Sequence, residues 1–248
     1  MKLFDYAPLS LAWREFLQSE FKKPYFLEIE KRYLEALKSP KTIFPKSSNL
    51  FYALNLTPPS AVKIILLGQD PYHSTYLENE RELPVAMGLS FSVEKNAPIP
   101  PSLKNIFKEL HANLGVPVPC CGDLSAWAKR GMLLLNAILS VEKNKAASHK
   151  YIGWEAFSDR ILMRLFKTTA PLIVVLLGKV AQKKIALIPP NKHIIITAPH
   201  PSPLSRGFLG SGVFTSVQKA YREVYRKDFD FSLWLMLNET EPLKNAFI

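Results

Sequence analysis

The chain has 248 residues, enough for one α/β domain with a substantial hydrophobic core, so a second domain is not required. It carries 32 Lys and Arg against 21 Asp and Glu, and this net charge of +11 favours negatively charged partners such as nucleic acid, an anionic membrane surface or acidic substrates. No apolar run approaches the roughly 18 residues that span a bilayer, and no signal peptide is evident, so we expect a soluble, cytoplasmic protein without a membrane partner.

The first 60 residues predict helices followed by a loop. Residues 9–38 have the apolar spacing of one or two amphipathic helices, with Pro24 as a break or a helix start. Residues 39–60 are rich in Pro, Ser and Lys and predict an ordered loop with a short helical turn at 49–54.

Four short apolar runs predict strands that are buried on both faces, at 62–67, 132–135, 172–177 and 193–197. Helix-like stretches lie between and after them, at 101–112, 123–130, 153–168, 180–187 and 213–227. This alternation predicts a single α/β domain over residues 1–248, with a central four-stranded, mainly parallel sheet flanked by helices on both faces. The tail, 228–248, has no clear periodicity, and we expect it to be partly disordered.

Polar, Gly or Pro residues follow all four predicted strands. The segments are Gly68–His73, Asn136, Gly178–Lys179 and Ala198–Ser205. Because ligands bind at the carboxyl ends of strands in open α/β sheets, these four ends predict one cleft.

Two residues in these segments are candidates for chemistry. Asp70 lies between Gly68 and Pro71 and would be a rigidly held carboxylate, although an Asp that caps a helix is about equally common there. His200 has a proline on each side; a lone His is more often structural, but the prolines reduce the entropy lost when a catalytic imidazole is held in place.

Together these motifs resemble the family 1 uracil-DNA glycosylases. The resemblance runs from about residue 45 to 225 in the order of the family. It is carried by the segments 68–73 (GQDPYH), 86–93 (AMGLSFSV), 100–103 (PPSL), 122–136 (GDLSAWAKRGMLLLN), 148–157 (SHKYIGWEAF), 200–205 (HPSPLS) and 206–210 (RGFLG).

The resemblance implies an enzyme that flips deoxyuridine out of DNA and hydrolyses its N-glycosidic bond. Asp70 would position water and favour the cationic sugar, and His200 would hydrogen-bond uracil O2 as the base leaves with negative charge. Gln69 lies in the same loop as Asp70, and the backbone N–H groups of that loop are expected to reach O2. Asn136 would read the uracil edge with its amide, and Tyr72 would exclude the thymine methyl group.

Further residues are implied to bind the base and the DNA. Phe91 would stack on the flipped base, although core packing alone would also explain a phenylalanine there. Leu204 would enter the stack that the flipped nucleotide leaves. The other residues implied to contact DNA are Pro100, Pro101, Ser102, Gly178, Lys179, Ser202 and Ser205. His149 and Trp154 match the family pattern but are interpreted as structural.

Three features depart from the family pattern. Residues 74–87 form a longer, acidic linker, which we expect to be a surface bulge. Lys179 stands where serine is usual, which would make DNA binding depend more steeply on salt. Arg206 and Gly207 follow Ser205 directly, so the loop that carries Leu204 is short.

Two other functions remain open from the residues alone. A metal-dependent hydrolase could use Asp70, His73 and His200 as ligands, but no HExxH or paired-carboxylate pattern is present. A non-catalytic nucleic-acid binding protein would suit the charge but would not need Asp70 and Asn136 at strand ends. A nucleotide-binding Rossmann enzyme is excluded because GxGxxG and GxxxxGK[ST] are both absent.

We therefore expect a monofunctional glycosylase without a metal or cofactor, acting as a monomer on single- and double-stranded DNA. The resemblance adds a proteinaceous inhibitor of the DNA-mimic type as a partner. The two cysteines, Cys120 and Cys121, are adjacent and cannot form an ordinary disulfide, which fits a reducing compartment.

Overall fold

The computed structural model describes residues 2–232, and its central element is a four-stranded parallel sheet with the strand order β5-β2-β7-β8. The strands are Met132–Asn136 (β5), Ile64–Gly68 (β2), Ile173–Leu177 (β7) and Ile194–Ala198 (β8). They coincide with the four apolar runs, which confirms the predicted fold. The prediction of burial on both faces is wrong for β8, because Ile195 and Thr197 are exposed on one face of this strand.

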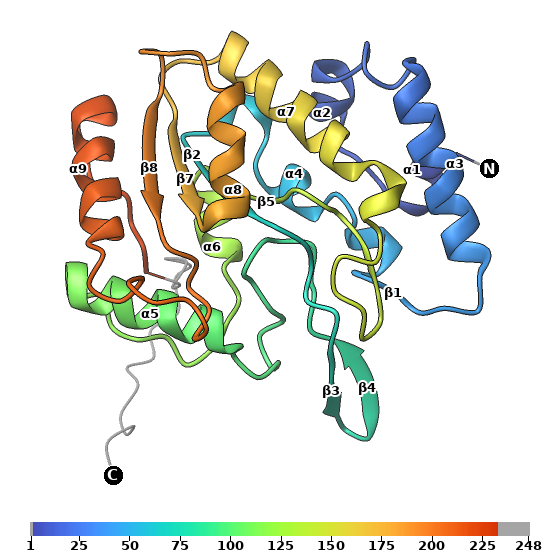
Figure 1. Cartoon of the computed structure of the whole chain (residues 1–248), viewed down its shortest axis with the longest axis horizontal. Helices are drawn as coiled ribbons and strands as arrows, with labels where there is room; N and C mark the ends of the chain where they lie inside the picture. The colour runs from blue at the N-terminus through green and yellow to red at the C-terminus, as the bar shows by residue number, and fades with distance from the viewer. Residues whose placement is uncertain (1, 233–248) are drawn as a thin grey trace, which may run out of the picture.

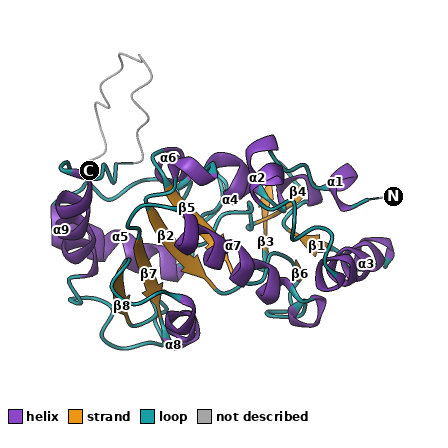
Figure 2. Cartoon of the chain, turned by 90° about the horizontal axis from the view of Figure 1, so that it is seen from above, coloured by secondary structure: helices purple, strands orange, loops and turns teal. Residues whose placement is uncertain are grey.

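Helices connect the strands in the predicted alternation. Their bounds are Leu3–Tyr6 (α1), Leu11–Phe16 (α2), Pro24–Lys38 (α3), Tyr52–Leu56 (α4), Pro101–Leu114 (α5), Ser125–Lys129 (α6), Trp154–Thr168 (α7), Lys179–Gln182 (α8) and Val213–Tyr225 (α9). Helices α7 and α8 lie on one face of the sheet, and α6 and α9 lie on the other (Figure 2). Pro24 begins α3, where its missing N–H costs no helical hydrogen bond.

Four short strands lie outside the central sheet. Ile43–Phe44 (β1) pairs with Val141–Glu142 (β6), and Thr75–Glu78 (β3) pairs with Arg81–Pro84 (β4), both antiparallel. Short 3-10 helices lie at Ser47–Asn49, Pro59–Ala61, Lys150–Ile152 and Lys183–Leu187.

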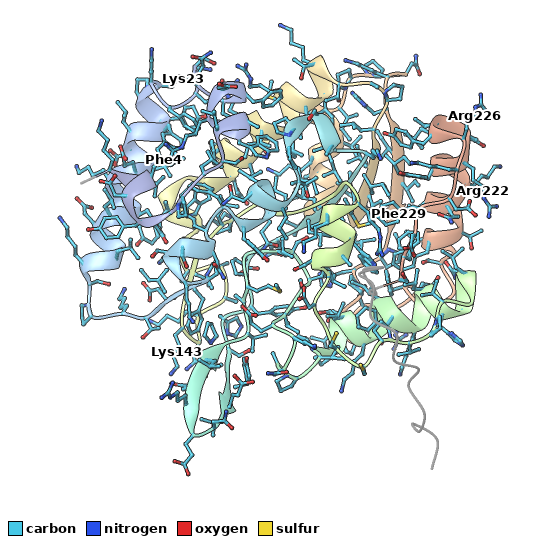
Figure 3. All side chains as sticks on the ribbon, turned by 180° about the vertical axis from the view of Figure 1, so that it is seen from behind. Phe4, Lys23, Lys143, Arg222, Arg226 and Phe229 are labelled. Atoms are coloured by element: carbon cyan, nitrogen blue, oxygen red, sulfur yellow. The ribbon has the colours of Figure 1, made fainter. Side chains whose placement is uncertain are left out.

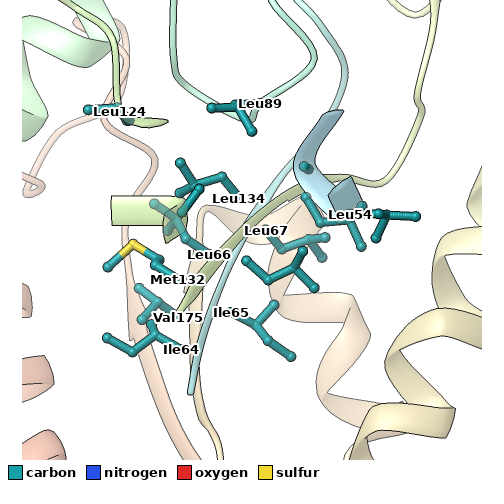
Figure 4. Packing of buried hydrophobic residues seen from close by; sticks show 14 of the residues in the cluster. Leu54, Ile64, Ile65, Leu66, Leu67, Leu89, Leu124, Met132, Leu134 and Val175 are labelled. Atoms are coloured by element: carbon teal, nitrogen blue, oxygen red, sulfur yellow. The ribbon is translucent and has the colours of Figure 1, made fainter. Parts of the chain in front are cut away.

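The core is built from the two faces of the central strands. Successive residues of β2 point to opposite faces, so Ile64 and Leu66 pack on one side and Ile65 and Leu67 on the other (Figure 4). Every residue of β2, β5 and β7 is buried. This close-packed layer holds the carboxyl ends of the three strands in fixed positions relative to one another.

The segment that follows α9 packs against the domain as far as it is described. Phe229 (labelled in Figure 3) and Phe231 are buried, and the indole N–H of Trp127 donates to the carbonyl of Phe231 at 2.7 Å. Residues 228–232 are therefore packed against the domain, and the rest of the tail that we expect to be partly disordered, 233–248, lies outside the described residues. None of the helices in the described part is long and apolar enough to cross a membrane.

Candidate active site

The parallel strands end at one edge of the sheet, and the predicted site residues gather there. Gly68 and Asn136 are register partners at the ends of β2 and β5. A cavity of about 240 Å³ opens at this edge. Of the predicted site residues, it is lined by Gln69, Asp70, Tyr72, Phe91, Ser102, Asn136 and His200. Three of the four predicted strand ends therefore line one cleft, while Gly178 and Lys179 are not among its lining residues.

A backbone hydrogen bond holds the Asp70 carboxylate. The N–H of Ala147 donates to Asp70 Oδ2 at 2.7 Å, and the N–H of Asn144 in the same loop donates to the carbonyl of His73 at 2.8 Å. On the other side of Asp70, the N–H of Ile138 donates to the carbonyl of Gln69 at 2.9 Å. These hydrogen bonds fix the direction of the carboxylate. None of the ion pairs among residues 2–232 includes Asp70, so no cationic side chain neutralises its charge.

The structure also determines which nitrogen of His200 carries the proton. The N–H of Ser202 donates to His200 Nδ1 at 3.1 Å, so Nδ1 is the acceptor of the neutral ring and Nε2 carries the hydrogen. Burial lowers the pKa of His200 below its usual value, which keeps the ring neutral at pH 7. The site therefore presents an uncharged N–H donor, suited to stabilising an oxyanion on a bound molecule.

The walls of the cavity hold an amide and two aromatic rings. Asn136 is buried at the end of β5, and the ring centroids of Phe91 and His200 lie 6.2 Å apart. The Tyr72 hydroxyl donates to the carbonyl of Phe91 at 3.2 Å and lies 3.2 Å from Ser102 Oγ. Burial raises the pKa of Tyr72 to about 12, so the phenol stays protonated and fixed against the wall.

Phe91 adopts a backbone conformation that is uncommon for a non-glycine residue. Its φ is +62°, and it lies in a loop between Ser90 and Ser92, both fully buried. Ser90 donates its N–H to the carbonyl of Leu134 at 3.0 Å, and Ser92 donates its hydroxyl to the carbonyl of Gly122 at 3.3 Å. These bonds hold the strained residue, and such strain is found mostly at functional sites.

The residues expected to contact DNA lie on three loops, and of these residues Ser102 lines the cavity. Pro100 and Pro101 begin α5, next to Ser102, and Gly178 and Lys179 begin α8. The third loop carries Ser202, Leu204 and Ser205, and Leu204 is 96% exposed. An apolar side chain this exposed makes almost no contact within its own chain.

The acidic linker, expected to be a surface bulge, contains a β-hairpin. Strands β3 and β4 meet at Asn79–Glu80, both with positive φ, and the hairpin projects from the edge where the central strands end (Figure 1). Lys143, at the base of the hairpin (Figure 3), binds Glu82 at 2.5 Å. The hairpin is therefore attached to the loop, residues 143–147, that orients Asp70.

Sequence reasoning missed this 143–147 loop, because its contribution is a backbone N–H that any residue could supply. Asn144 and Ala147 both have positive φ, and the only sequence signal for this conformation is that asparagine adopts it more often than most residues. His149 and Trp154 are structural, as interpreted: both are buried, and both hydrogen-bond Ser140 Oγ at 2.8 Å.

The alternative of a metal site finds no support in the geometry. Among residues 2–232, no group of three or more His, Cys, Asp and Glu side chains is arranged to hold a metal ion. Cys120 and Cys121 are both free thiols.

Comparison with known proteins agrees with this geometry. The model of the uracil DNA glycosylase superfamily matches residues 54–227. A uracil-DNA glycosylase from Helicobacter pylori is 97% identical over 94% of this chain and all of its own length. One from Helicobacter hepaticus is 54% identical over 82% of this chain and 86% of its own.

Solved structures agree as well. Mimivirus uracil-DNA glycosylase superposes with a TM-score of 0.85 at 28% identity, over 92% of this chain and 88% of the viral one. A variant of mimivirus UNG, solved in complex with UGI, superposes with a TM-score of 0.83 at 28% identity, over 90% of this chain and 88% of that one. The family model, the curated relatives and the shared fold agree, and the chain belongs to the uracil DNA glycosylase superfamily.

Proposed function

We propose that the chain is a family 1 uracil-DNA glycosylase that hydrolyses the N-glycosidic bond of a flipped deoxyuridine, releasing uracil and leaving an abasic site. The observation that carries the proposal is that a fixed carboxylate, a neutral imidazole N–H donor and a buried amide line one cavity. The domain would comprise residues 1–248. A monomer that works in the cytoplasm remains a prediction.

Recognition of the base would depend on Asn136 and the two aromatic rings. Uracil presents an acceptor at O4 and a donor at N3, and the Asn136 amide can supply one group of each kind. Cytosine reverses this pattern and would leave buried polar groups unpaired. Phe91 would stack on the flipped ring, and the fixed Tyr72 ring would meet the methyl group of thymine.

Bond cleavage would depend on charges that develop as the base leaves. Uracil departs with the bonding electrons, and negative charge grows on O2, where the Nε2–H of His200 would donate. The sugar acquires oxocarbenium character, which the Asp70 carboxylate would stabilise while it orients the attacking water. No lysine is needed as a nucleophile, so we expect no strand cleavage.

DNA binding would use the three loops that carry Ser102, Lys179 and Leu204. Ser102 and Ser202 would hydrogen-bond backbone phosphates, with Pro100, Pro101, Gly178 and Ser205 shaping the loops. Lys179 would add a phosphate contact that is screened by salt. Leu204 would fill the gap in the stack of a duplex. The same surface would bind a protein inhibitor that mimics DNA, by analogy with the mimivirus complex.

The test is release of free uracil from single- and double-stranded oligonucleotides that contain one deoxyuridine, with a chelator present. We expect release from both, and none from the matched thymidine oligonucleotides. Asp70→Asn is the control that separates this activity from a contaminating glycosylase. Loss of activity in chelator would instead favour the metal-dependent hydrolase.

A further inference from the structure

A buried carboxylate outside the cavity has no role in the chemistry described above. Glu109 of α5 is only 1% exposed, yet none of the ion pairs among residues 2–232 includes it. Its oxygens accept the N–H groups of Gly210 at 2.6 Å and Gly212 at 2.8 Å, the Ser211 hydroxyl at 3.2 Å and the Asn113 amide at 3.1 Å. Three of these four bonds come from one short stretch of the loop between β8 and α9.

These bonds keep Glu109 ionised. Burial by itself raises the pKa of a carboxyl group, but the hydrogen bonds from Gly210, Gly212, Asn113 and Ser211 together outweigh it and hold the pKa of Glu109 below its usual value. Hydrogen bonds to a charged acceptor are stronger than those to a neutral one. Glu109 is therefore a strong anchor for the residues that bind it.

The anchored stretch belongs to the loop that carries Leu204, Pro201–Gly212, here called the wedge loop. The loop runs along α5 (Figure 1), and α5 also holds its beginning, where the Asn105 amide donates to the carbonyl of Pro201 at 2.8 Å. Asn105 and Glu109 are four residues apart and so lie on the same face of the helix. One helix face thus holds both ends of the wedge loop, while Leu204 projects from it into solvent.

The wedge loop combines three glycines with a few hydrogen bonds of its own, such as that from the N–H of Ser205 to the carbonyl of Ser202 at 2.9 Å. Its glycines at 207, 210 and 212 all have positive φ, and glycine loses more conformational entropy on ordering than any other residue. The contacts that hold it within the domain include the buried residues Pro201 and Phe208 and the hydrogen bonds to α5. An apolar side chain can enter a base stack only if the backbone beneath it is held against the force of insertion.

We propose that Glu109 is a positioning residue that fixes the base of the wedge loop so that Leu204 can enter duplex DNA. This inference rests on the proposed function. A single strand has no opposing stack to open, so Glu109 should matter for duplex substrates and much less for single strands.

The variant that tests the proposal is Glu109→Gln. It keeps the shape of the side chain but places an amide N–H₂ where a backbone N–H now donates, which leaves a buried donor unpaired. We expect kcat/KM on duplex uracil-DNA to fall about 10-fold more than kcat/KM on the same sequence as a single strand, as one lost buried hydrogen bond would produce.

Two comparisons separate positioning from a general loss of stability. Thr57→Val removes another buried hydrogen bond, from the Thr57 hydroxyl to the carbonyl of Ala128 outside the wedge loop, and should leave the duplex to single-strand ratio unchanged. If Glu109 acts through Leu204, the ratio in the double variant Glu109→Gln/Leu204→Ala should equal that of Leu204→Ala alone. The proposal would be overturned if the effects of the two substitutions on this ratio multiplied in the double variant. It would also be overturned if Glu109→Gln lowered kcat/KM equally on duplex and single-stranded DNA.

A measurement without DNA tests the anchor itself. Hydrogen exchange of the Gly210 and Gly212 amides, followed by NMR, should be faster in Glu109→Gln than in the wild type, while exchange in β2 stays unchanged. Unchanged exchange at both glycines would overturn the anchoring role. Absence of uracil release by the wild type on either substrate would refute the proposed function instead.

Discussion

Replacement of Gly178 by alanine should displace His200 and slow catalysis. Gly178 has φ +86° and ψ 161°, a region open almost only to glycine, so an alanine there costs about 1–3 kcal/mol of strain. A Cβ at this position would lie 2.8 Å from His200 Cβ and 3.4 Å from its Cα. Ordinary contact begins at 3.4 Å, so the added Cβ and His200 Cβ must move apart by about 0.6 Å, from 2.8 to 3.4 Å.

A shift of this size acts on the group expected to donate to uracil O2. Since a misplacement of about 1 Å can cost about 10²-fold in rate, we expect kcat/KM on single-stranded uracil-DNA to fall about 10- to 10²-fold. The assay is steady-state release of uracil, paired with thermal unfolding. Gly115→Ala is the matched control, because Gly115 also has positive φ (+68°) but nothing lies within 4 Å of its added Cβ. Wild-type kcat/KM in Gly178→Ala, or an equal loss in Gly115→Ala, would refute the reasoning.

Four further predictions concern the cavity and a buried histidine. Asp70→Asn should lower kcat about 10²- to 10³-fold while binding to uracil-DNA persists, and an unchanged kcat would remove the carboxylate from the mechanism. Asn136→Asp should lose most action on uracil and gain release of cytosine, measured by chromatography of the free bases; loss of uracil release with no gain on cytosine would count against edge reading. Tyr72→Ala should admit thymine weakly, and complete failure to release it would leave the aromatic ring without a gating role. Burial holds the pKa of His149 at about 4, below the value of about 6.5 in an unfolded chain, so the unfolded state gains a proton first as pH falls. The free energy of unfolding should therefore drop by up to about 3 kcal/mol between pH 7 and pH 4 in urea titrations, and His149→Gln should lack this part of the slope. Parallel curves for the two proteins would contradict this assignment.

The central sheet and the position of the site could be read from the sequence because both follow from short-range pattern. Apolar runs such as Ile64–Gly68 and Ile173–Leu177 are too hydrophobic for a surface and too short for a core helix, which leaves a covered parallel strand. In a parallel sheet the strand ends share one edge, so Asp70, Asn136 and His200 were expected to lie together. The chemical assignments came from the resemblance of the motifs at those ends to a known family.

Only the tertiary structure shows the features that depend on backbone hydrogen bonds and on contacts between segments far apart in the sequence. The Ala147 N–H that orients Asp70 and the Ser202 N–H that sets the proton on His200 Nε2 are backbone groups, which residue identity does not encode. The paired strands of residues 75–84 are not predictable from the sequence, because a polar Asn79–Glu80 turn is only a weak signal for a hairpin. Glu109 looks like an ordinary helix residue in the sequence. Its burial and its hydrogen bonds to Gly210 and Gly212 arise only when segments about a hundred residues apart are packed together.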